Sequence, residues 1–516
     1  MDIPRIPVIL QPDSRNQSEL CFAVMDRTQR RKSPAGFFIH QTVFQDQSRV
    51  NFEDPPILSM DLSNPTWWVY IALLVVAVYF RFGRVFSVRN LDLLLLLALS
   101  TSLTATVLLT PSGSQATDTP AEQATPSADQ SEAPILPVRR PFSQYWSTIL
   151  LFTTLALLVR LVLDERFTRR PRLEQNLNLG GLTFLCIPAF GILMSHVALL
   201  PPPDHNQQAL RYGRALLDRQ EATLESTGDE LKPPAPTETL VAAGGNLVAG
   251  LAQKETDWVA RSLVISAHTL VVGGMVLTGH LHFASLQLGI SMACLYLLLP
   301  CTGVYVHQLS HVLPAACLVW AFVAYRRPLL SGILLGLACG TLFFAIFLLP
   351  LWAVFYGRKG GIRFFASVVG VAAVLISCLL LISHDASSFV DKLITTANWT
   401  VFRLLEANTM TGTAEVGMII VRILMGALFF VMMTALTVIP RPRNFENLLG
   451  NSTCLIVAAQ LWYPEDIGHY VLWYLPLLLM VIFRPRLDRL VPPESPSRQR
   501  LRQRADTALH RTTAAV

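Results

Sequence analysis

The sequence predicts an all-α, polytopic membrane protein: a helical bundle of about 11 spans, one broken or re-entrant hairpin and small external helical loops. Two observations on the sequence predict this class. Of the 516 residues, 52% are apolar and only 15% are charged. The apolar residues gather in long runs, many of them separated by short loops rich in arginine. A physical constraint completes the argument, because backbone amides in hydrocarbon must find their hydrogen-bond partners within the same segment.

A bilayer core of about 30 Å requires roughly 20 apolar residues for each helical span. Several of the runs are shorter than this, so their boundaries are only approximate. The apolar runs cover residues 66–80, 91–110, 144–163, 177–200, 262–278, 285–299, 307–325, 329–355, 364–383, 416–439, 448–463 and 469–483. We expect each of them to form a helix.

The net charge of +6 does not predict a nucleic-acid partner. Most basic residues lie in short loops between apolar runs, where lysine and arginine set membrane topology. The expected partner is therefore membrane lipid. Six of the eight cysteines fall inside apolar runs, where a thiol acts as a small hydrophobe, and Cys301 lies two residues after one of them. We expect no disulfide framework and no CxxC metal pair.

Residues 1–59 are polar and contain no apolar core of the length that a signal peptide needs. Met60 opens the stretch MDLSNPTWWVYIALL, which has a short polar lead, an aromatic pair and then an apolar run, as a natural start would. We interpret residues 1–59 either as a disordered tail or as an artefact of start-codon choice.

The basic loops predict an orientation in the cell inner membrane. Arginines follow the runs 66–80, 144–163, 307–325, 416–439 and 469–483, and cytoplasmic loops are enriched in such residues. If these loops are cytoplasmic, the N-terminus lies outside and the C-terminus inside.

One basic loop, residues 358–363, conflicts with this alternation if the run 329–355 is a simple span. That run contains Gly332, Gly336, Gly340 and Pro350. Glycine permits close backbone approach and proline interrupts helical hydrogen bonding. We therefore interpret the run as a broken or re-entrant hairpin that leaves and returns on the cytoplasmic side. The alternative is a plain span followed by a positively charged outer loop.

The remaining organisation follows from these assignments. The expected segments are 60–110 with the first two spans, 111–142 as a low-complexity external linker, 143–200 with spans three and four, 201–260 as an external loop with an amphipathic helix, 261–383 as a membrane core, 384–415 as an external loop, 416–491 with the C-terminal spans and 492–516 as a basic disordered tail.

His307 and His311 form the sharpest local pattern, because histidines at i and i+4 share one face of a helix. Gln308 stands where a metalloprotease needs a glutamate, which argues against that class. No third metal ligand is evident, so no cofactor is predicted, and a divalent metal is an open alternative without support. Two readings remain: packed or solvated interfacial histidines, or polar groups at the outer mouth of a cavity.

Other polar residues lie at the outer ends of runs or within them. Arg422 lies inside the run 416–439, where an unpaired charge is costly and usually points toward protein or water; a structural pair with Glu406 or Glu415 is the alternative. Arg160 lies near the inner end of its run, and we expect it to extend its charge to the interface. The further candidates are Asp204, Arg403, Glu465, Asp466 and His469.

Residues 279–381 resemble bacterial GT-C-type glycosyltransferases, the multi-spanning enzymes that use polyprenyl-phosphate sugars. The shared elements are a span that ends at an outer proline (YLLLPCTG), a span that ends in basic residues (VAYRR), and a glycine-rich segment (SGILLGLACG) that continues into LLPLW and a second basic loop. The C-terminal stretch LWYPEDIGHYVLWYLPLLL is also similar to the final spans of that group.

The resemblance implies transfer of a sugar from a polyprenyl-phosphate donor at the external face. It implies Asp204 as the catalytic base, since this residue is the best match by position to the family's external acidic residue. The expected substrate-binding residues are His307, His311, Arg403, Arg422, Glu465, Asp466 and His469. Two alternatives remain: a transporter or lipid-handling protein, and a non-catalytic membrane scaffold that retains a degenerate glycosyltransferase core.

Overall fold

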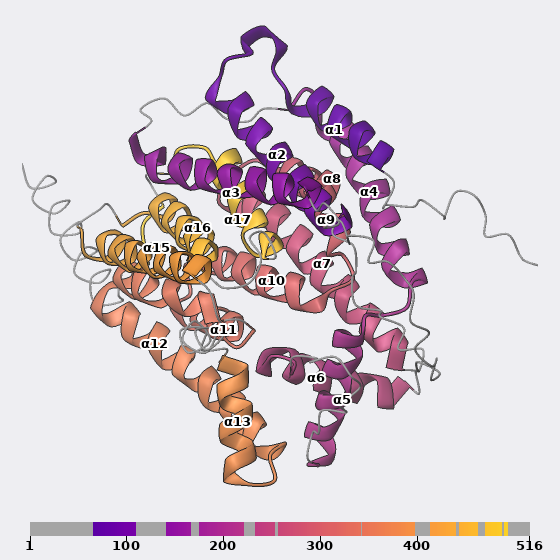
Figure 1. Ribbon diagram of the computed structural model, residues 1–516, viewed down its shortest axis with the longest axis vertical. Coiled ribbons are helices and arrows are strands. Elements are labelled where there is room, and N and C mark those ends of the chain that lie inside the picture. Colours follow the sequence, from indigo (N-terminus) through magenta and orange to yellow (C-terminus); the bar gives the residue numbers. More distant parts are fainter. Residues whose placement is uncertain are drawn as a thin grey trace, which may run out of the picture. The chain divides into compact units, whose positions relative to one another are not determined.

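The computed structural model describes residues 65–109, 141–166, 175–220, 233–252, 256–341, 343–397, 413–439, 443–462, 470–487 and 490–493. The chain divides into two units, Met1–Ser59 and Met60–Val516. The first unit lies outside the described residues. Almost all of the predicted linker 111–142 and the tail after residue 493 lie outside them as well. Within the described ranges all regular elements are helices, which confirms the all-α class (Figure 1).

The α-helices follow one another along the chain with short connections in the central part. They are α1 Pro65–Tyr79, α2 Val88–Leu109, α3 Pro141–Val162, α4 Leu179–Leu199, α5 Asp204–Asp218, α6 Pro236–Ala252, α7 Thr256–Leu281, α8 Leu286–Leu298, α9 Pro300–Val304, α10 Leu309–Val323, α11 Pro328–Cys339, α12 Leu349–Leu381, α13 Ala386–Ala397, α15 Thr413–Val438, α16 Phe445–Trp462 and α17 Val471–Phe483. Short 3-10 helices cover Phe82–Arg84, Leu163–Arg166 and Phe343–Leu348.

Five helical segments among the described residues are long and apolar enough to cross a membrane. They are Val88–Leu108, Tyr145–Val162, Leu179–Leu199, Thr256–Leu281 and Phe344–Leu381. Further apolar helices, such as α8, α10 and α17, have between 10 and 17 residues. A membrane-embedded helical protein is therefore supported, while the count of about 11 spans stays a prediction.

Burial follows the pattern expected when the surrounding solvent is lipid. The helices α8, α10, α16 and α17 are buried almost along their whole length and form the core. By contrast, α4 and α15 expose large apolar side chains, for example Phe184, Leu428 and Val431. In water such surfaces would promote aggregation, whereas in a bilayer they meet acyl chains.

The segment from α11 to α12 folds back on itself. Gly357 has φ 65° and ψ −174° and interrupts α12. The hydroxyl of Tyr356, just before this break, donates a hydrogen bond of 2.7 Å to the backbone carbonyl of Tyr325, just before α11. With about 1.5 Å of rise per residue, the 12 residues of α11 extend only about 18 Å. The chain therefore turns back after α11 and returns to the end from which α11 starts.

The second half of α12 then runs parallel to α11. A Cβ atom built on Gly332 would meet the backbone of Phe364, one on Gly336 would meet Val368 and Val371, and one on Gly340 would meet Leu375. Contacts that advance four residues at a time on both helices define a parallel pair. This geometry is the fold-back predicted for the run 329–355. A single straight span would instead place Tyr325 and Tyr356 at opposite ends.

The arginine-rich loops meet at one end of the bundle, which we name the arginine face. It comprises residues 81–87, 163–166, 324–327, 356–363, 443–444 and 484–487. Ring contacts connect these loops: Tyr325 lies 4.7 Å from Phe445 and Tyr79 lies 5.9 Å from Phe483, centroid to centroid. The opposite end, which we name the histidine face, comprises residues 196–206, 235–238, 305–311, 340–341 and 470. There the backbone N–H of Thr237 donates to the carbonyl of Gly340 at 3.1 Å.

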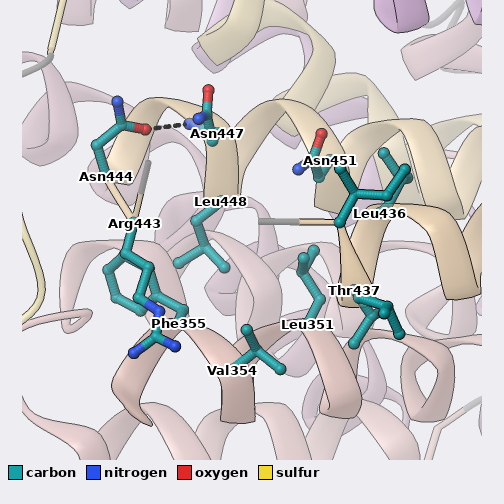
Figure 2. Close-up of a pocket in the computed structure, with 12 residues that line it drawn as sticks. Leu351, Val354, Phe355, Leu436, Thr437, Arg443, Asn444, Asn447, Leu448 and Asn451 are labelled. Atoms are coloured by element: carbon teal, nitrogen blue, oxygen red, sulfur yellow. Dashed lines mark hydrogen bonds between the residues drawn. The ribbon is translucent and has the colours of Figure 1, made fainter. Parts of the chain in front are cut away.

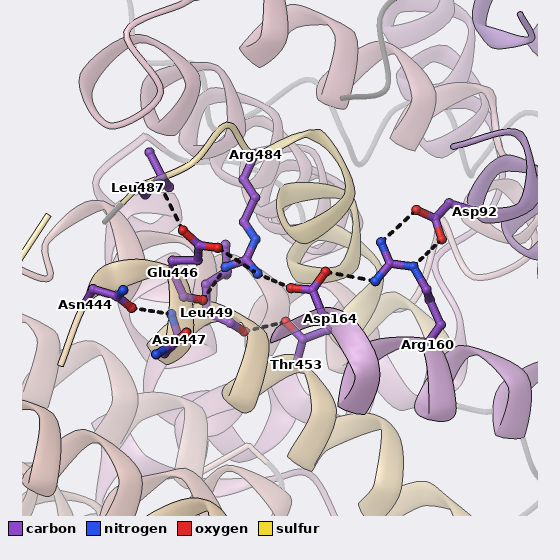
Figure 3. A network of polar contacts seen from close by, with 10 residues as sticks. All are labelled: Asp92, Arg160, Asp164, Asn444, Glu446, Asn447, Leu449, Thr453, Arg484 and Leu487. Carbon is purple, nitrogen blue, oxygen red and sulfur yellow. Dashed lines mark hydrogen bonds and ion pairs between the residues drawn. The ribbon is translucent and has the colours of Figure 1, made fainter. Parts of the chain in front are cut away.

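A buried charge network stabilises the arginine face (Figure 3). Arg160 of α3 binds Asp92 of α2 through two hydrogen bonds of 2.8 and 3.0 Å and binds Asp164 at 2.8 Å. Asp164 also pairs with Arg484, which follows α17. Arg484 in turn contacts Glu446 of α16, 3.7 Å away. Arg160 thus binds two buried carboxylates at the arginine face, and its expected position at the membrane interface stays a prediction.

Candidate functional site

The side chain of Asn206 connects α5 to the turn that precedes α10. The side-chain amide of Asn206 donates a 2.7 Å hydrogen bond to the backbone carbonyl of His307, and its oxygen accepts one of 3.2 Å from the backbone N–H of Leu309. Within the predicted loop 201–260, α5 buries Ala209 and Tyr212 and exposes its arginines. The first turn of α5, including Asp204, is thereby fixed beside the turn that precedes α10.

His307 lies in that turn and contacts a second histidine. Its Nε2 atom is 2.9 Å from Nδ1 of His196, near the end of α4. Burial, and to a smaller extent the neighbouring His196, lower the pKa of His307 to about 4. His307 is therefore uncharged at neutral pH, and the pair shares a hydrogen bond in which one ring N–H donates to the other ring.

His205 and Glu238 form a second pair next to the first. Nε2 of His205 lies 3.1 Å from Oε2 of Glu238, whose side chain is only 3% exposed. Glu238 also accepts a hydrogen bond of 3.4 Å from the backbone N–H of Ala235, so it caps the start of α6 as well. Asp204 precedes His205 and is exposed. The site thus contains a buried carboxylate with a partner and an exposed carboxylate next to it.

His311 is buried and packed between aromatic rings. It stacks on Tyr305 at 4.5 Å with an interplanar angle of 10°, and on Tyr470 at 6.0 Å and 24°. The expectation that His307 and His311 share a helical face was wrong, because α10 begins at Leu309 and His307 lies in the preceding turn. The described residues contain no group of three or more His, Cys, Asp or Glu side chains that could hold a metal ion.

The structure thus places Asp204 and His307 at the same end of the bundle, with His311 behind them in the core. Arg403, Glu465, Asp466 and His469 lie outside the described residues. Arg422 belongs to α15, but its side chain is also outside what the structure describes. Their convergence on one cavity stays a prediction.

Four residues of the site were not among the predicted site residues: His196, His205, Asn206 and Glu238. The sequence carried a signal for one of them, because Pro236 at the first position of α6 and Glu238 at the third are typical of a helix start. The partners of His196 and Asn206 lie 111 and 101 residues away along the chain, and no local pattern reveals such pairs.

Comparisons with protein-family models, with curated proteins and with solved structures found no significant match. The resemblance to GT-C-type glycosyltransferases therefore stays a prediction from the sequence.

Proposed function

We propose that the protein is an integral membrane glycosyltransferase that transfers a sugar from a polyprenyl-phosphate donor to an acceptor at the histidine face. The observation that carries this proposal is the pair of hydrogen bonds that the side chain of Asn206 makes with the backbone of His307 and Leu309. They hold the exposed carboxylate of Asp204 beside paired histidines, at the end of the bundle opposite the arginine-rich loops. An exposed carboxylate on a fixed helix start can reach a substrate that arrives from the membrane surface.

In the proposed reaction, Asp204 accepts the proton of an acceptor hydroxyl as that oxygen attacks the anomeric carbon of the sugar. The bond between this carbon and the phosphate oxygen breaks, and the polyprenyl phosphate departs with the bonding electron pair. Because one ring N–H of the neutral pair His196–His307 is used between the rings, the N–H of the other ring can donate a hydrogen bond to an anionic oxygen. The predicted positions Arg403, Arg422, Glu465, Asp466 and His469 complete the proposed donor and acceptor sites, with His311 in a supporting position.

The proposal includes an orientation in the bacterial inner membrane. Because cytoplasmic loops are enriched in arginine and lysine, the arginine face is assigned to the cytoplasm and the histidine face to the outside. The chain would then have its N-terminus outside and its C-terminus in the cytoplasm.

Asp204→Asn tests the catalytic assignment. Loss of a general base is expected to lower the rate of sugar transfer by about 10²–10⁴-fold. The measurement is transfer of radiolabelled sugar from polyprenyl-phosphate donors in membranes that contain the full-length protein. Asp218→Asn is the matched control, since Asp218 is exposed at the other end of the same helix. Transfer by Asp204→Asn at the wild-type rate would refute the assignment.

The fold-back of α11 and α12 favours a second candidate, a lipid transporter, because interrupted helices often build substrate sites within membranes. This candidate predicts movement of a fluorescent polyprenyl phosphate across liposome membranes without any sugar transfer. If neither transfer nor movement occurs, the scaffold alternative gains support.

A further inference from the structure

A cavity of about 220 Å³ lies between α12, α15 and α16, next to the arginine face (Figure 2). It belongs to the end of the bundle opposite Asp204 and does not depend on the proposed sugar transfer. Figure 2 shows three asparagines along one side, leucine and valine side chains along the other and Arg443 at one end.

The asparagines give the cavity a row of hydrogen-bonding groups. Asn444 precedes α16, and Asn447 and Asn451 lie three and seven residues further on, so all three share one side of the helix. Asn444 and Asn451 are each only 8% exposed. The oxygen of Asn444 accepts a 2.8 Å hydrogen bond from the backbone N–H of Asn447. The side chains of all three asparagines line the cavity.

Asn444 and Asn451 together provide amide N–H donors among the groups that line the cavity. A ligand with oxygen acceptors would satisfy these donors.

Arg443 adds a positive charge at the end of the cavity. Its guanidinium lies against the break in α12, since a Cβ atom on Gly357 would be 3.1 Å from Nη1 of Arg443. No carboxylate of the described residues pairs with Arg443, and no acidic residue lines the cavity. The nearby carboxylate of Glu446 is turned toward Arg484 and toward the backbone N–H of Leu487, which donates to it at 3.0 Å. The cavity therefore favours an anion.

The opposite wall and the rim are apolar. Leu351 and Val354 of α12 and Leu436 of α15 line the wall. Val438, at the rim, is 71% exposed and belongs to the same α15 surface that exposes apolar side chains along its length. The cavity thus opens where acyl chains would lie, with its polar groups at the depth of the arginine-rich loops.

We propose that this cavity binds the headgroup of an anionic membrane phospholipid. Arg443 would pair with the phosphate, and the amides of Asn444 and Asn451 would donate to its oxygens or to a glycerol hydroxyl. The volume is below the roughly 300–1,000 Å³ of pockets for drug-sized ligands, which suits a headgroup while the acyl chains lie outside along α15. A lipid in this position would contact both the break in α12 at Gly357 and the start of α16.

The test uses the purified full-length protein in neutral detergent, with added dioleoylphosphatidylglycerol or dioleoylphosphatidylcholine, and measures retained lipid by native mass spectrometry. The wild type is expected to retain phosphatidylglycerol preferentially. Arg443→Gln is expected to weaken this retention by roughly tenfold or more, since a hydrogen bond to a charged group is lost. Arg327→Gln removes an exposed arginine from the same face outside the cavity and serves as the matched control.

Asn451→Leu provides a second variant, which keeps Arg443 and removes the buried amide. It should also weaken retention, and size-exclusion chromatography establishes that it is folded. Equal retention by Arg443→Gln and the wild type would overturn the proposal, as would equal retention of phosphatidylcholine. If inorganic phosphate displaces phosphatidylglycerol completely and stabilises the protein as well as the lipid does, the cavity is a site for free phosphate and the lipid assignment is wrong.

Discussion

Arg484→Leu is expected to lower the free energy of unfolding by about 3–5 kcal/mol, because it removes the buried arginine that contacts two buried carboxylates. The side chain of Arg484 is 2% exposed, and those of Asp164 and Glu446 are 5% and 6% exposed. Leucine supplies no hydrogen bond to either carboxylate. The loss of one arginine therefore affects the contacts of α3, α16 and the segment after α17 at the same time.

The measurement is unfolding of the purified protein in detergent, followed by circular dichroism as denaturant increases. Arg486→Leu is the control, because Arg486 is exposed two residues further on and its loss should change stability by about 1 kcal/mol or less. Asp164→Asn combined with Arg484→Leu should cost less than the sum of the single changes, since the two residues are in contact. Strict additivity, or an effect of Arg484→Leu no larger than that of the control, would contradict the network.

Gly332→Val is expected to destabilise the hairpin by about 1–3 kcal/mol or more, since inserted methyl groups in a packed contact force backbone shifts. A Cβ atom on Gly332 would lie 2.5 Å from the backbone carbonyl oxygen of Phe364, which cannot rotate away as a side chain can. The added valine would separate α11 from the second half of α12 and disturb the fold-back that joins Tyr325 to Tyr356.

Gly370→Val is the matched control, because Gly370 lies in the same half of α12 and a Cβ atom there would meet nothing within 4 Å. Thermal unfolding, followed by fluorescence-detected size-exclusion chromatography, compares the two variants. A large drop in the unfolding temperature for Gly332→Val and a small one for Gly370→Val is the expected result. Equal drops would mean that α11 and α12 are not in the close contact described.

The helices and the fold-back could be predicted from the sequence because lipid imposes simple rules. Long apolar runs must be helical, and the glycines at 332, 336 and 340 recur every four residues on one face, where close helix packing needs them. The conflict of Arg358 and Lys359 with a simple alternation of sides pointed to a return of the chain, and the hydrogen bond from Tyr356 to Tyr325 shows that return.

Other features depend on contacts that no local pattern encodes. Arg160 binds Asp92, 68 residues away, and Arg484 binds Asp164, 320 residues away. The polar residues at the ends of apolar runs indicated the histidine face, yet the contact of His307 with His196 depends on how α4 and α10 pack. The helix α6 lies in the predicted external loop 201–260 and was not among the predicted elements, although Pro236 and Glu238 are typical of a helix start.

The most direct test of this topology is labelling of single cysteines at positions 326 and 358, in a variant without native cysteines. An impermeant maleimide is added to right-side-out and to inside-out membrane vesicles, and a cysteine at position 384, beyond the far end of α12, reports the opposite side. We predict that positions 326 and 358 react from the same, cytoplasmic, side and position 384 from the other. Reaction of positions 326 and 358 from opposite sides would contradict the re-entrant hairpin and the two faces built on it.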